Sequence, residues 1–187
     1  NDKYYLQLDI RKYYYSINHN ILRNFISKKI KDERIVNLIM LFVDTAKGIG
    51  LFVGNVLSQL FGLIYLSPLD HFVKRVLKIK HYIRYVDDFV LVGLEKSEAH
   101  ILKSKIESFL KDNLNLELSK FRIAKIKQGC NFVGFRTWKR VKFIRKHTLH
   151  NFSKAVKLQK EASIISILGH AKHSSSHKYL ISKIGAA

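Results

Sequence analysis

The chain has 187 residues, of which 47% are hydrophobic, and its formal net charge is +20. This composition supports one sizeable core with a small appendage and excludes a disordered tail. The excess of Lys and Arg makes a polyanion the expected partner, with an anionic membrane surface or a ribosome-like assembly as alternatives. The single cysteine, Cys130, excludes an intrachain disulfide and agrees with a reducing cytosol.

The first part of the chain predicts one buried strand followed by helices. Residues 4–10 are mostly apolar and aromatic, as in a buried strand, and Asn18 or His19 can cap the helix that follows. A second helix is expected at 34–45, a turn at 47–50, and a mostly helical stretch at 55–77 that Pro68 kinks or interrupts. Polar residues break the apolar stretch 49–73, so we expect no transmembrane helix there, and no signal peptide is visible.

The remainder predicts a hairpin, a helix and further strands before a helical end. Two short strands are expected at 81–94, a helix at 97–111, strands over 114–126, and an aromatic-rich hairpin at 129–144. From residue 149 the pattern is helical and basic, with an interruption at 169–176. This order predicts an α+β fold in which helices pack on one face of an antiparallel sheet.

Charge is distributed unevenly along the chain. From Lys120 to the C-terminus there are 16 Lys and Arg but one acid, Glu161, so this part carries 16 − 1 = +15 of the +20. The other 13 acids lie in the first two thirds. A protein that binds nucleic acid needs a reason to keep carboxylates near its partner, and metal binding is one such reason.

Three aspartates are the strongest candidates for a metal site. Asp9 ends the first strand, and Asp87-Asp88 lie at the tip of a tight hairpin with apolar flanks. Adjacent carboxylates repel by roughly 4 kcal/mol at an intermediate dielectric, and two divalent ions about 4 Å apart both offset this and clamp the oxygens of a phosphoryl transfer. An isolated Asp-Asp is usually a solvated turn. The flanking strands, the tyrosine two residues earlier and the upstream aspartate favour the metal site here.

The segment Tyr85-Val86-Asp87-Asp88 resembles the Tyr-x-Asp-Asp box of reverse transcriptases, and residues 8–19 resemble the first metal-binding motif of that family. The resemblance implies a polymerase palm at 1–147, with partial fingers at 18–50, and a small helical basic thumb at 148–187. It implies that Asp9 and Asp87 bind two Mg²⁺ ions, with Mn²⁺ as a substitute, that the carbonyl of Ile10 adds a ligand, and that Asp88 completes the acidic cluster. Because eight residues precede Asp9, most of the fingers are missing, and we expect this chain alone to polymerise poorly.

The same resemblance assigns a nucleotide pocket. Tyr14 occupies the position of the bulky residue that crowds a 2′-hydroxyl and so selects deoxynucleotides, with an ordinary core aromatic as the alternative. Residues 50–59 resemble the family segment beneath the template and the incoming base. The implied nucleotide-binding residues are Tyr14, Val53, Gly54 and Tyr85, and the implied template contacts are Ser58 and Gln59.

The combination Val53-Gly54 with Ser58-Gln59 resembles the reverse transcriptases of diversity-generating retroelements, a bacterial and phage group that copies a template RNA with errors at adenines. An aliphatic residue in place of an amide removes a polar contact, and base contacts are worth roughly 1–3 kcal/mol each. A neutral substitution at Val53 is the alternative. Phe52 departs from the proline often found at its position in the family.

Basic and small residues of the last third are candidates for primer contact. Lys120, with Arg122 second, resembles the lysine that protonates the leaving pyrophosphate, although either can equally be a solvated charge. Residues 128–135 resemble the hairpin that grips the primer end, and the basic residues beyond extend this surface. The implied contacts are Gly129, Phe132, Gly134, Lys139, Arg140, Lys142 and Arg145. The tail at 167–173 resembles the thumb helices, and phosphate contact is favoured over zinc because no Cys or carboxylate accompanies its histidines.

The resemblance implies an RNA-directed DNA polymerase that uses template RNA, a DNA primer and dNTPs. It also implies a basic oligomeric accessory protein as partner, no membrane, and a cytoplasmic location for a bacterial or phage-encoded protein. A group II intron, retron or phage-defence reverse transcriptase is the nearest alternative. A noncatalytic RNA-binding subunit that retains a palm fold is the second. An RNA polymerase is the third, and it is disfavoured because Tyr14 would exclude ribonucleotides.

Overall fold

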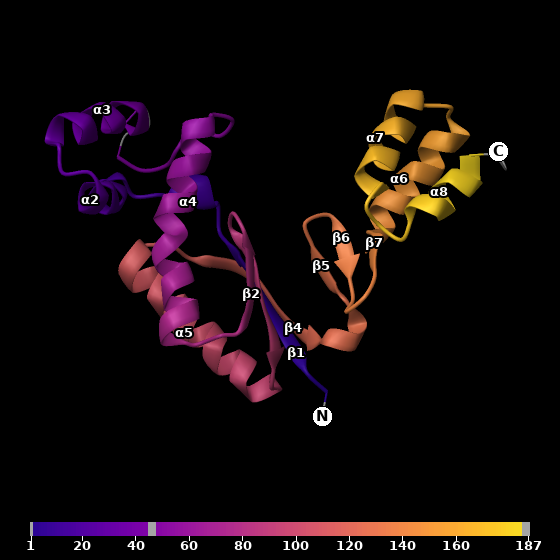
Figure 1. The fold of residues 1–187 in the computed structure, drawn as a ribbon, viewed down its shortest axis with the longest axis horizontal. Coiled ribbons are helices and arrows are strands. Elements are labelled where there is room, and N and C mark those ends of the chain that lie inside the picture. Colours follow the sequence, from indigo (N-terminus) through magenta and orange to yellow (C-terminus); the bar gives the residue numbers. More distant parts are fainter. Residues whose placement is uncertain (1, 45–47, 185–187) are drawn as a thin grey trace. The chain divides into compact units, whose positions relative to one another are not determined.

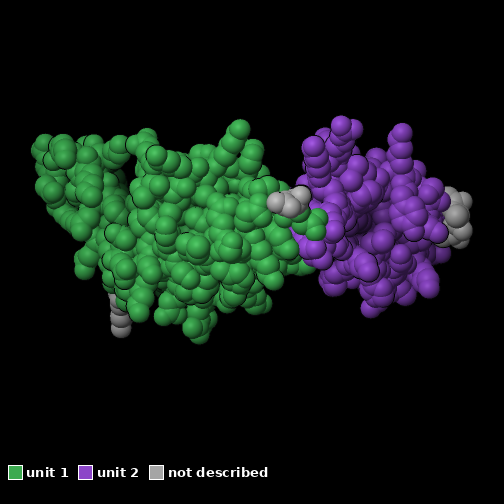
Figure 2. All heavy atoms as spheres, turned by 90° about the horizontal axis from the view of Figure 1, so that it is seen from below, with its two compact units in different colours: residues 1–124 green, residues 125–187 purple. Residues whose placement is uncertain are grey.

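A computed structural model describes residues 2–44 and 48–184. The chain divides into two compact units, Asn1–Ala124 and Lys125–Ala187 (Figure 2). Each unit has its own hydrophobic core. Two predicted boundaries lie outside the described residues: residue 45, where the second helix was expected to end, and Lys47, where the turn was expected to begin.

Unit 1 is built on a four-stranded sheet. Its strands are β1 (Tyr4–Ile10), β2 (His81–Tyr85), β3 (Asp88–Leu94) and β4 (Leu118–Lys125), in the order β2-β3-β1-β4. Strand β3 pairs antiparallel with both β1 and β2, which confirms the predicted strand at 4–10 and the predicted hairpin at 81–94. Alternate residues Leu6, Leu8 and Ile10 are buried, as expected for a strand with one face against a core.

Helices cover that apolar face. These are α4 (Val56–His71) and α5 (Lys96–Leu114), whereas α2 (His19–Lys29) packs against α4 and α3 (Glu33–Val43), and the short α1 (Tyr13–Ser16) follows β1. Buried residues of β1, β3, α4 and α5 form one cluster, and Figure 1 shows α4 and α5 together beside the sheet. The Tyr65 hydroxyl on α4 donates to the Leu114 carbonyl at 2.7 Å, and burial raises the pKa of Tyr65 to about 12. The α+β fold with helices on one face of an antiparallel sheet is therefore confirmed.

Helix boundaries follow local signals where these exist. The Asn18 side chain accepts hydrogen bonds from the backbone N–H groups of Asn20 and Ile21, so of the two predicted candidates Asn18 is the N-cap of α2 and His19 is its first residue. Pro68 does not interrupt α4, which continues to His71 and is followed by a π-helical segment, η1 (Phe72–Val76). The chain therefore departs from α-helical geometry one turn later than the proline suggests.

Helix α4 and η1 together form the segment Val56–Val76, which by length and composition alone is long and apolar enough to cross a membrane. Of its most apolar part, 39% is buried inside the protein. The core helices of soluble proteins meet the same criterion, so this is weak evidence for a membrane span.

The predicted strand at 114–118 is wrong in its first part. Helix α5 continues to Leu114, Asn115 adopts a left-handed conformation with φ of 52°, and β4 begins at Leu118. Leu110 and Leu114 are both fully buried at helical spacing, and Leu116 is buried in the turn after the helix. The alternation of leucines therefore spans a helix end and a turn, which periodicity alone does not separate.

Unit 2 combines a small sheet with three helices. A short 3-10 segment, η2 (Ile126–Gln128), leads into β5 (Cys130–Phe132), β6 (Phe135–Thr137) and β7 (Lys142–Ile144), which pair antiparallel in sequence order. The helices are α6 (Lys146–Lys157), α7 (Glu161–Ala171) and α8 (His177–Ile184). Ile144, Phe152, Ala171 and Leu180 form the core of this unit. The small sheet and the three helices therefore belong to one unit. The predicted division into palm and thumb after residue 147 stays a prediction.

Candidate active site

A two-residue turn, Val86 and Asp87, joins β2 to β3, because Tyr85 and Asp88 are directly paired in the ladder. Val86 has a φ of 55°, in the left-handed region. A β-branched residue occupies this region at a cost of roughly 1–3 kcal/mol, and such strain persists where surrounding contacts hold it. The strained turn therefore needs support from its neighbours, and it carries the Asp87 carboxylate next to Asp88, the first residue of β3.

Asp9 lies beside this turn. It is the register partner of Asp88 in the β1–β3 ladder, and directly opposite residues of antiparallel strands project to the same face. The backbone N–H of Ile10 donates to the carbonyl of Asp87 at 3.3 Å. Burial, and then the negative charge of Asp9, raise the pKa of the Asp87 carboxyl above its ordinary value. The structure thus brings the three aspartates to one end of the β1–β3 ladder.

Two neighbouring side chains orient these carboxylates, and sequence reasoning missed both. The Gln7 amide nitrogen donates to the two carboxylate oxygens of Asp88, at 3.0 and 3.2 Å. The Ser119 hydroxyl, from β4, donates to the Asp9 carboxylate. Gln7 precedes Asp9 by two residues on one strand, so strand periodicity is a signal that places both on one face. No comparable signal exists for Ser119, which is 110 positions from Asp9.

The carboxylates at this turn meet some of the requirements for binding a divalent cation. Within residues 2–44 and 48–184, no group of three or more His, Cys, Asp or Glu side chains is arranged to hold a metal ion. The charge of Asp9 nevertheless disfavours ionisation of Asp87, which is a repulsion that a cation would offset. Mg²⁺ prefers oxygen ligands and is commonly held by one or two carboxylates together with substrate phosphates. The pair Asp9 and Asp87 fits that pattern, whereas the Asp88 carboxylate is bonded to Gln7.

A cavity of about 380 Å³ lies beside the turn. Its walls include all six residues that the sequence assigned to nucleotide and template contact, which are Tyr14, Val53, Gly54, Ser58, Gln59 and Tyr85. Asn55, Leu63, Arg84 and Val86 complete the lining. Segments that lie far apart in the sequence thus meet in one cavity, although the role of each residue stays a prediction.

Tyr14 lies within electrostatic reach of the acidic turn. Burial, and then the negative charge of Asp87, raise the pKa of the Tyr14 hydroxyl, so it stays protonated at neutral pH. Gly62 on α4 leaves room for this ring, because a Cβ there would lie 3.0 Å from Tyr14 Cε1. Tyr13 packs beside it, with ring centroids 5.3 Å apart, and donates its hydroxyl proton to the Gly62 carbonyl.

His19 contacts the backbone at Gly50, just before the segment that carries Val53 and Gly54. The imidazole is 3% exposed, with Nδ1 at 2.8 Å from the Asp44 carboxylate and Nε2 at 2.7 Å from the Gly50 carbonyl. The two ring nitrogens thus face a side-chain carboxylate on one side and a backbone carbonyl on the other. His19 thereby links α2 to the segment at Gly50 that leads into Val53 and Gly54 of the cavity wall.

Arg84 supports the strained turn, and sequence reasoning did not single it out. Its guanidinium donates to both carboxylate oxygens of Asp70 on α4, at 2.8 and 2.5 Å, and to the carbonyl of Val86 at 3.0 Å. Burial disfavours the charge of Arg84, but the hydrogen bond and charge of Asp70 outweigh it and raise the pKa of the guanidinium. The Tyr82 hydroxyl also donates to Asp70, at 2.8 Å. These contacts link the α4 helix to the carbonyl of the residue that precedes Asp87.

The predicted primer contacts lie in unit 2, apart from Lys120, which is exposed on β4 next to Ser119. Lys139, Arg140 and Lys142 line a basic hollow of about 550 Å³ together with Lys172 and His173. Arg145 is exposed and precedes α6, and Phe132 is half-buried at the end of β5. The hairpin and the tail are thus brought together within unit 2.

The glycines of the hairpin have a packing role. A Cβ at Gly129 would lie 2.6 Å from Trp138 Cε2, and a Cβ at Gly134 would lie 2.8 Å from His170 Cε1. The His170 ring stacks on Phe135, with centroids 4.5 Å apart. The space beside these glycines is therefore filled from within unit 2, and their contact with a primer stays a prediction.

The family model for reverse transcriptase (RNA-dependent DNA polymerase) matches residues 1–137, which include every strand of unit 1 and the strands β5 and β6. The chain belongs to the reverse transcriptase family. No curated protein matches it by sequence.

Solved telomerase structures share the fold of this reverse transcriptase. Apo telomerase from Candida tropicalis has a TM-score of 0.58 and 17% sequence identity, over 78% of this chain and 33% of that chain. Telomerase from Candida albicans, in complex with a fragment of telomeric RNA, has a TM-score of 0.59 and 16% identity, over 85% and 36%. A telomerase–RNA complex from Candida tropicalis has a TM-score of 0.55 and 16% identity, over 97% and 40%. The chain therefore spans about a third to two fifths of these proteins.

Proposed function

We propose that the protein transfers a nucleotide from a dNTP to the 3′-hydroxyl of a primer paired with a template RNA. The observation that carries this proposal is the meeting of Asp9 and Asp87 beside a cavity lined by Tyr14, Val53 and Tyr85. Carboxylates next to a nucleotide-sized cavity are the arrangement that metal-assisted phosphoryl transfer requires.

The carboxylates act by holding Mg²⁺, or Mn²⁺ in its place. Asp9 and Asp87 hold it, with the carbonyl of Ile10 as a further ligand and Asp88 beside them. When bound, the ions neutralise charge on the reacting phosphate and favour ionisation of the primer hydroxyl. The Ser119 hydroxyl orients Asp9 and the Gln7 amide orients Asp88, so both acids present fixed lone pairs. Lys120 donates a proton to the leaving pyrophosphate, and in unit 2 Gly129, Phe132, Gly134 and the basic hairpin residues follow the sugar-phosphate backbone of the primer.

Tyr14 selects the sugar. Its ring is packed against Gly62 and Tyr13, so it cannot move away without disturbing α4. A 2′-hydroxyl placed against this ring meets a steric clash, which disfavours ribonucleotides and separates this proposal from an RNA polymerase. The tyrosine hydroxyl stays neutral beside Asp87, so it adds no charge to the repulsion between the carboxylates.

We further propose the diversity-generating retroelement class, with errors at template adenines. Val53 is 61% exposed and lines the cavity next to Gly54, so an aliphatic surface stands where an amide would offer a polar contact. Template RNA contacts Ser58 and Gln59 at the first turn of α4. A basic oligomeric accessory protein and a cytoplasmic location, without membrane attachment, belong to the same proposal, and a group II intron, retron or phage-defence enzyme is the alternative class.

Primer extension by the full-length protein on a defined RNA template tests the activity. Asp87→Asn and Asp9→Asn should each abolish extension in Mg²⁺ and in Mn²⁺. Asp112→Asn, which alters an exposed acid on α5, should retain it. Unchanged extension by Asp87→Asn would contradict the catalytic proposal. It would favour the noncatalytic RNA-binding subunit, and a measurement of RNA binding by the same variants would test that alternative.

Sequencing the extension products tests the finer proposals. Misincorporation concentrated at template adenines, and reduced by Val53→Gln, is the expected result, because glutamine restores an amide at the cavity wall. Errors spread evenly over the four bases would instead favour the group II intron, retron or phage-defence class. Efficient use of rNTPs by the protein, without a gain from Tyr14→Ala, would contradict the role of Tyr14.

A further inference from the structure

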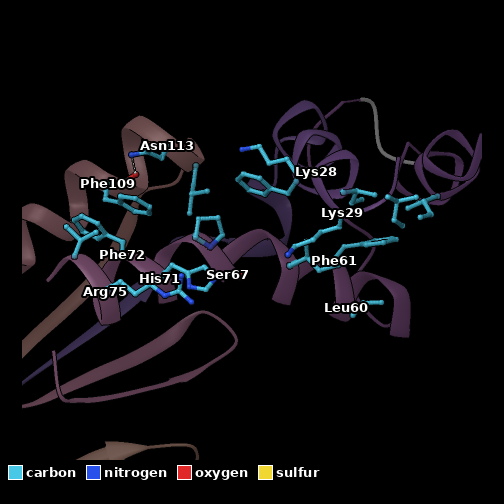
Figure 3. A pocket seen from close by; sticks show the side chains of 18 residues that line it. Lys28, Lys29, Leu60, Phe61, Ser67, His71, Phe72, Arg75, Phe109 and Asn113 are labelled. Carbon is cyan, nitrogen blue, oxygen red and sulfur yellow. Dashed lines mark hydrogen bonds between the residues drawn. The ribbon is translucent and has the colours of Figure 1, made fainter. Parts of the chain in front are cut away.

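A second, larger groove lies among the helices of unit 1 (Figure 3). Its volume is about 970 Å³, and it lies between α2, the long segment formed by α4 and η1, and the C-terminal part of α5. It shares no lining residue with the cavity beside Asp87. Neither the sequence motifs nor the proposed polymerase reaction gives this groove a role.

The floor of the groove is apolar and runs along one helix face. Its residues on α4 and η1 recur every three or four positions, from Leu60 through Ile64, Pro68 and Phe72 to Val76. Leu60 is 49% exposed and Val76 is 66% exposed, so the stripe is open to solvent at both ends. These 17 positions span about 25 Å at the rise of a helix, which is long for a small molecule and suits an elongated partner.

Aromatic side chains close the walls. Phe72 stacks on Phe109 of α5, with ring centroids 4.2 Å apart and planes 10° from parallel. On the α2 side, Phe25 lines the groove with Lys28 above its ring, 5.8 Å from the centroid. Helices of neighbouring proteins commonly bind in grooves of this kind, which take apolar side chains at helical spacing.

Charge around the groove has one sign. Lys28, Lys29, His71 and Arg75 line it, and none of its 18 lining residues is Asp or Glu. In Figure 3, Lys28 and Lys29 come from α2, and His71 and Arg75 come from the α4–η1 segment. Sequence positions 1–124 hold 20 Lys and Arg but also 13 Asp and Glu, so the absence of acids from the lining is a local feature. A partner that fits must combine an apolar face with negative charge at its edges.

We propose that this groove binds an amphipathic helix of a partner protein, with apolar residues on one face and Asp or Glu on its flanks. A second copy of this chain would bring further positive charge, since the net charge is +20. A nucleic acid presents phosphates, which gain nothing from an apolar floor. A bilayer surface is flat on this scale and does not enter a concave site. The proposal does not depend on polymerase activity.

Two synthetic helices are the probes, measured by fluorescence anisotropy with the full-length protein. Each has about 18 residues with leucines along one face, and the flanks carry Glu in one peptide and Lys in the other. The expected result is at least tenfold tighter binding of the Glu peptide. Leu60→Ser with Val76→Ser should weaken that binding at least tenfold, whereas Ile101→Ser, at an apolar α5 residue that is 57% exposed outside the groove, should not.

A charge exchange makes the test specific to the rim. Lys28→Glu with Lys29→Glu should weaken binding of the Glu peptide and strengthen binding of the Lys peptide. The control, Lys96→Glu with Lys105→Glu at exposed positions elsewhere on α5, should leave the preference for the Glu peptide unchanged. Equal affinity for the two peptides, or no binding of either, overturns the proposal. Anionic phospholipid vesicles and duplex RNA are the remaining probes. The proposal is also overturned if Leu60→Ser with Val76→Ser abolishes binding of either one while it leaves binding of the Glu peptide unchanged.

Discussion

Replacing Arg84 by lysine tests whether the acidic turn is held from α4. The Arg84 side chain is 10% exposed and its partner Asp70 is 34% exposed, so the ion pair is largely shielded from water. Lysine keeps the positive charge but not the planar fork, and it cannot bond to both oxygens of Asp70 and to the Val86 carbonyl together.

The magnitude follows from the bonds lost. A hydrogen bond to a charged group contributes about 1.5–3 kcal/mol, and breaking a fully buried pair costs about 3–5 kcal/mol. Because Asp70 is partly exposed, we expect Arg84→Lys to lower the free energy of unfolding by about 2–3 kcal/mol. The matched control is Arg34→Lys, in the exposed ion pair with Asp32, where Arg34 is 93% exposed and the free energy of unfolding should stay nearly unchanged.

The assays are urea unfolding followed by circular dichroism, and primer extension by the full-length protein. Arg84→Lys should lower kcat more than it raises the KM for dNTP, because Arg84 acts on Asp87 through the Val86 carbonyl, whereas Tyr14 and Val53 of the cavity come from other segments. In a Val86→Gly background the loss of stability should be smaller, since glycine adopts the left-handed turn without help. The reasoning is refuted if Arg84→Lys costs no more than Arg34→Lys, or if its cost is the same with Val86→Gly.

Three further changes test other parts of the structure. Asp87→Asn should raise the melting temperature at pH 7 while abolishing primer extension, because the raised pKa of Asp87 means that its ionised form opposes folding. That gain should shrink as the pH falls toward the ordinary carboxyl range, where the native carboxyl is itself protonated, and a gain that grows on acidification would contradict the assigned direction. Gly129→Ala should destabilise unit 2 by about 2–3 kcal/mol in thermal unfolding, because φ is 75° and the new Cβ would meet the Trp138 ring, whereas Gly169→Ala, with open space around it, should be neutral or stabilising. His19→Leu should lower the free energy of unfolding by about 1–3 kcal/mol in urea, because it removes the hydrogen bonds to the Asp44 carboxylate and the Gly50 carbonyl, and a neutral result would show that these two bonds contribute nothing.

Features that depend on neighbours in the sequence were predicted well. The strand at 4–10, the hairpin around Asp87-Asp88 and the Asn18 cap follow from apolar alternation, turn residues and a local side-chain hydrogen bond. The errors occur where a pattern has two readings: Leu114 and Leu116 alternate as a strand would, but one ends α5 and the other lies in the turn. Pro68 is an interruption signal that tertiary packing of α4 overrides.

The amino-acid sequence by itself determined the family, the pair Asp87-Asp88, the upstream Asp9 and the basic last third, because these depend on residue type and spacing. The tertiary structure decided which side chains support them: Ser119 on Asp9, Gln7 on Asp88, and Asp70 with Arg84 behind the strained turn. It also placed the hairpin strands in one compact unit with the last three helices. The physical reason is that hydrogen bonds between residues tens of positions apart depend on how strands and helices pack, which local periodicity does not encode.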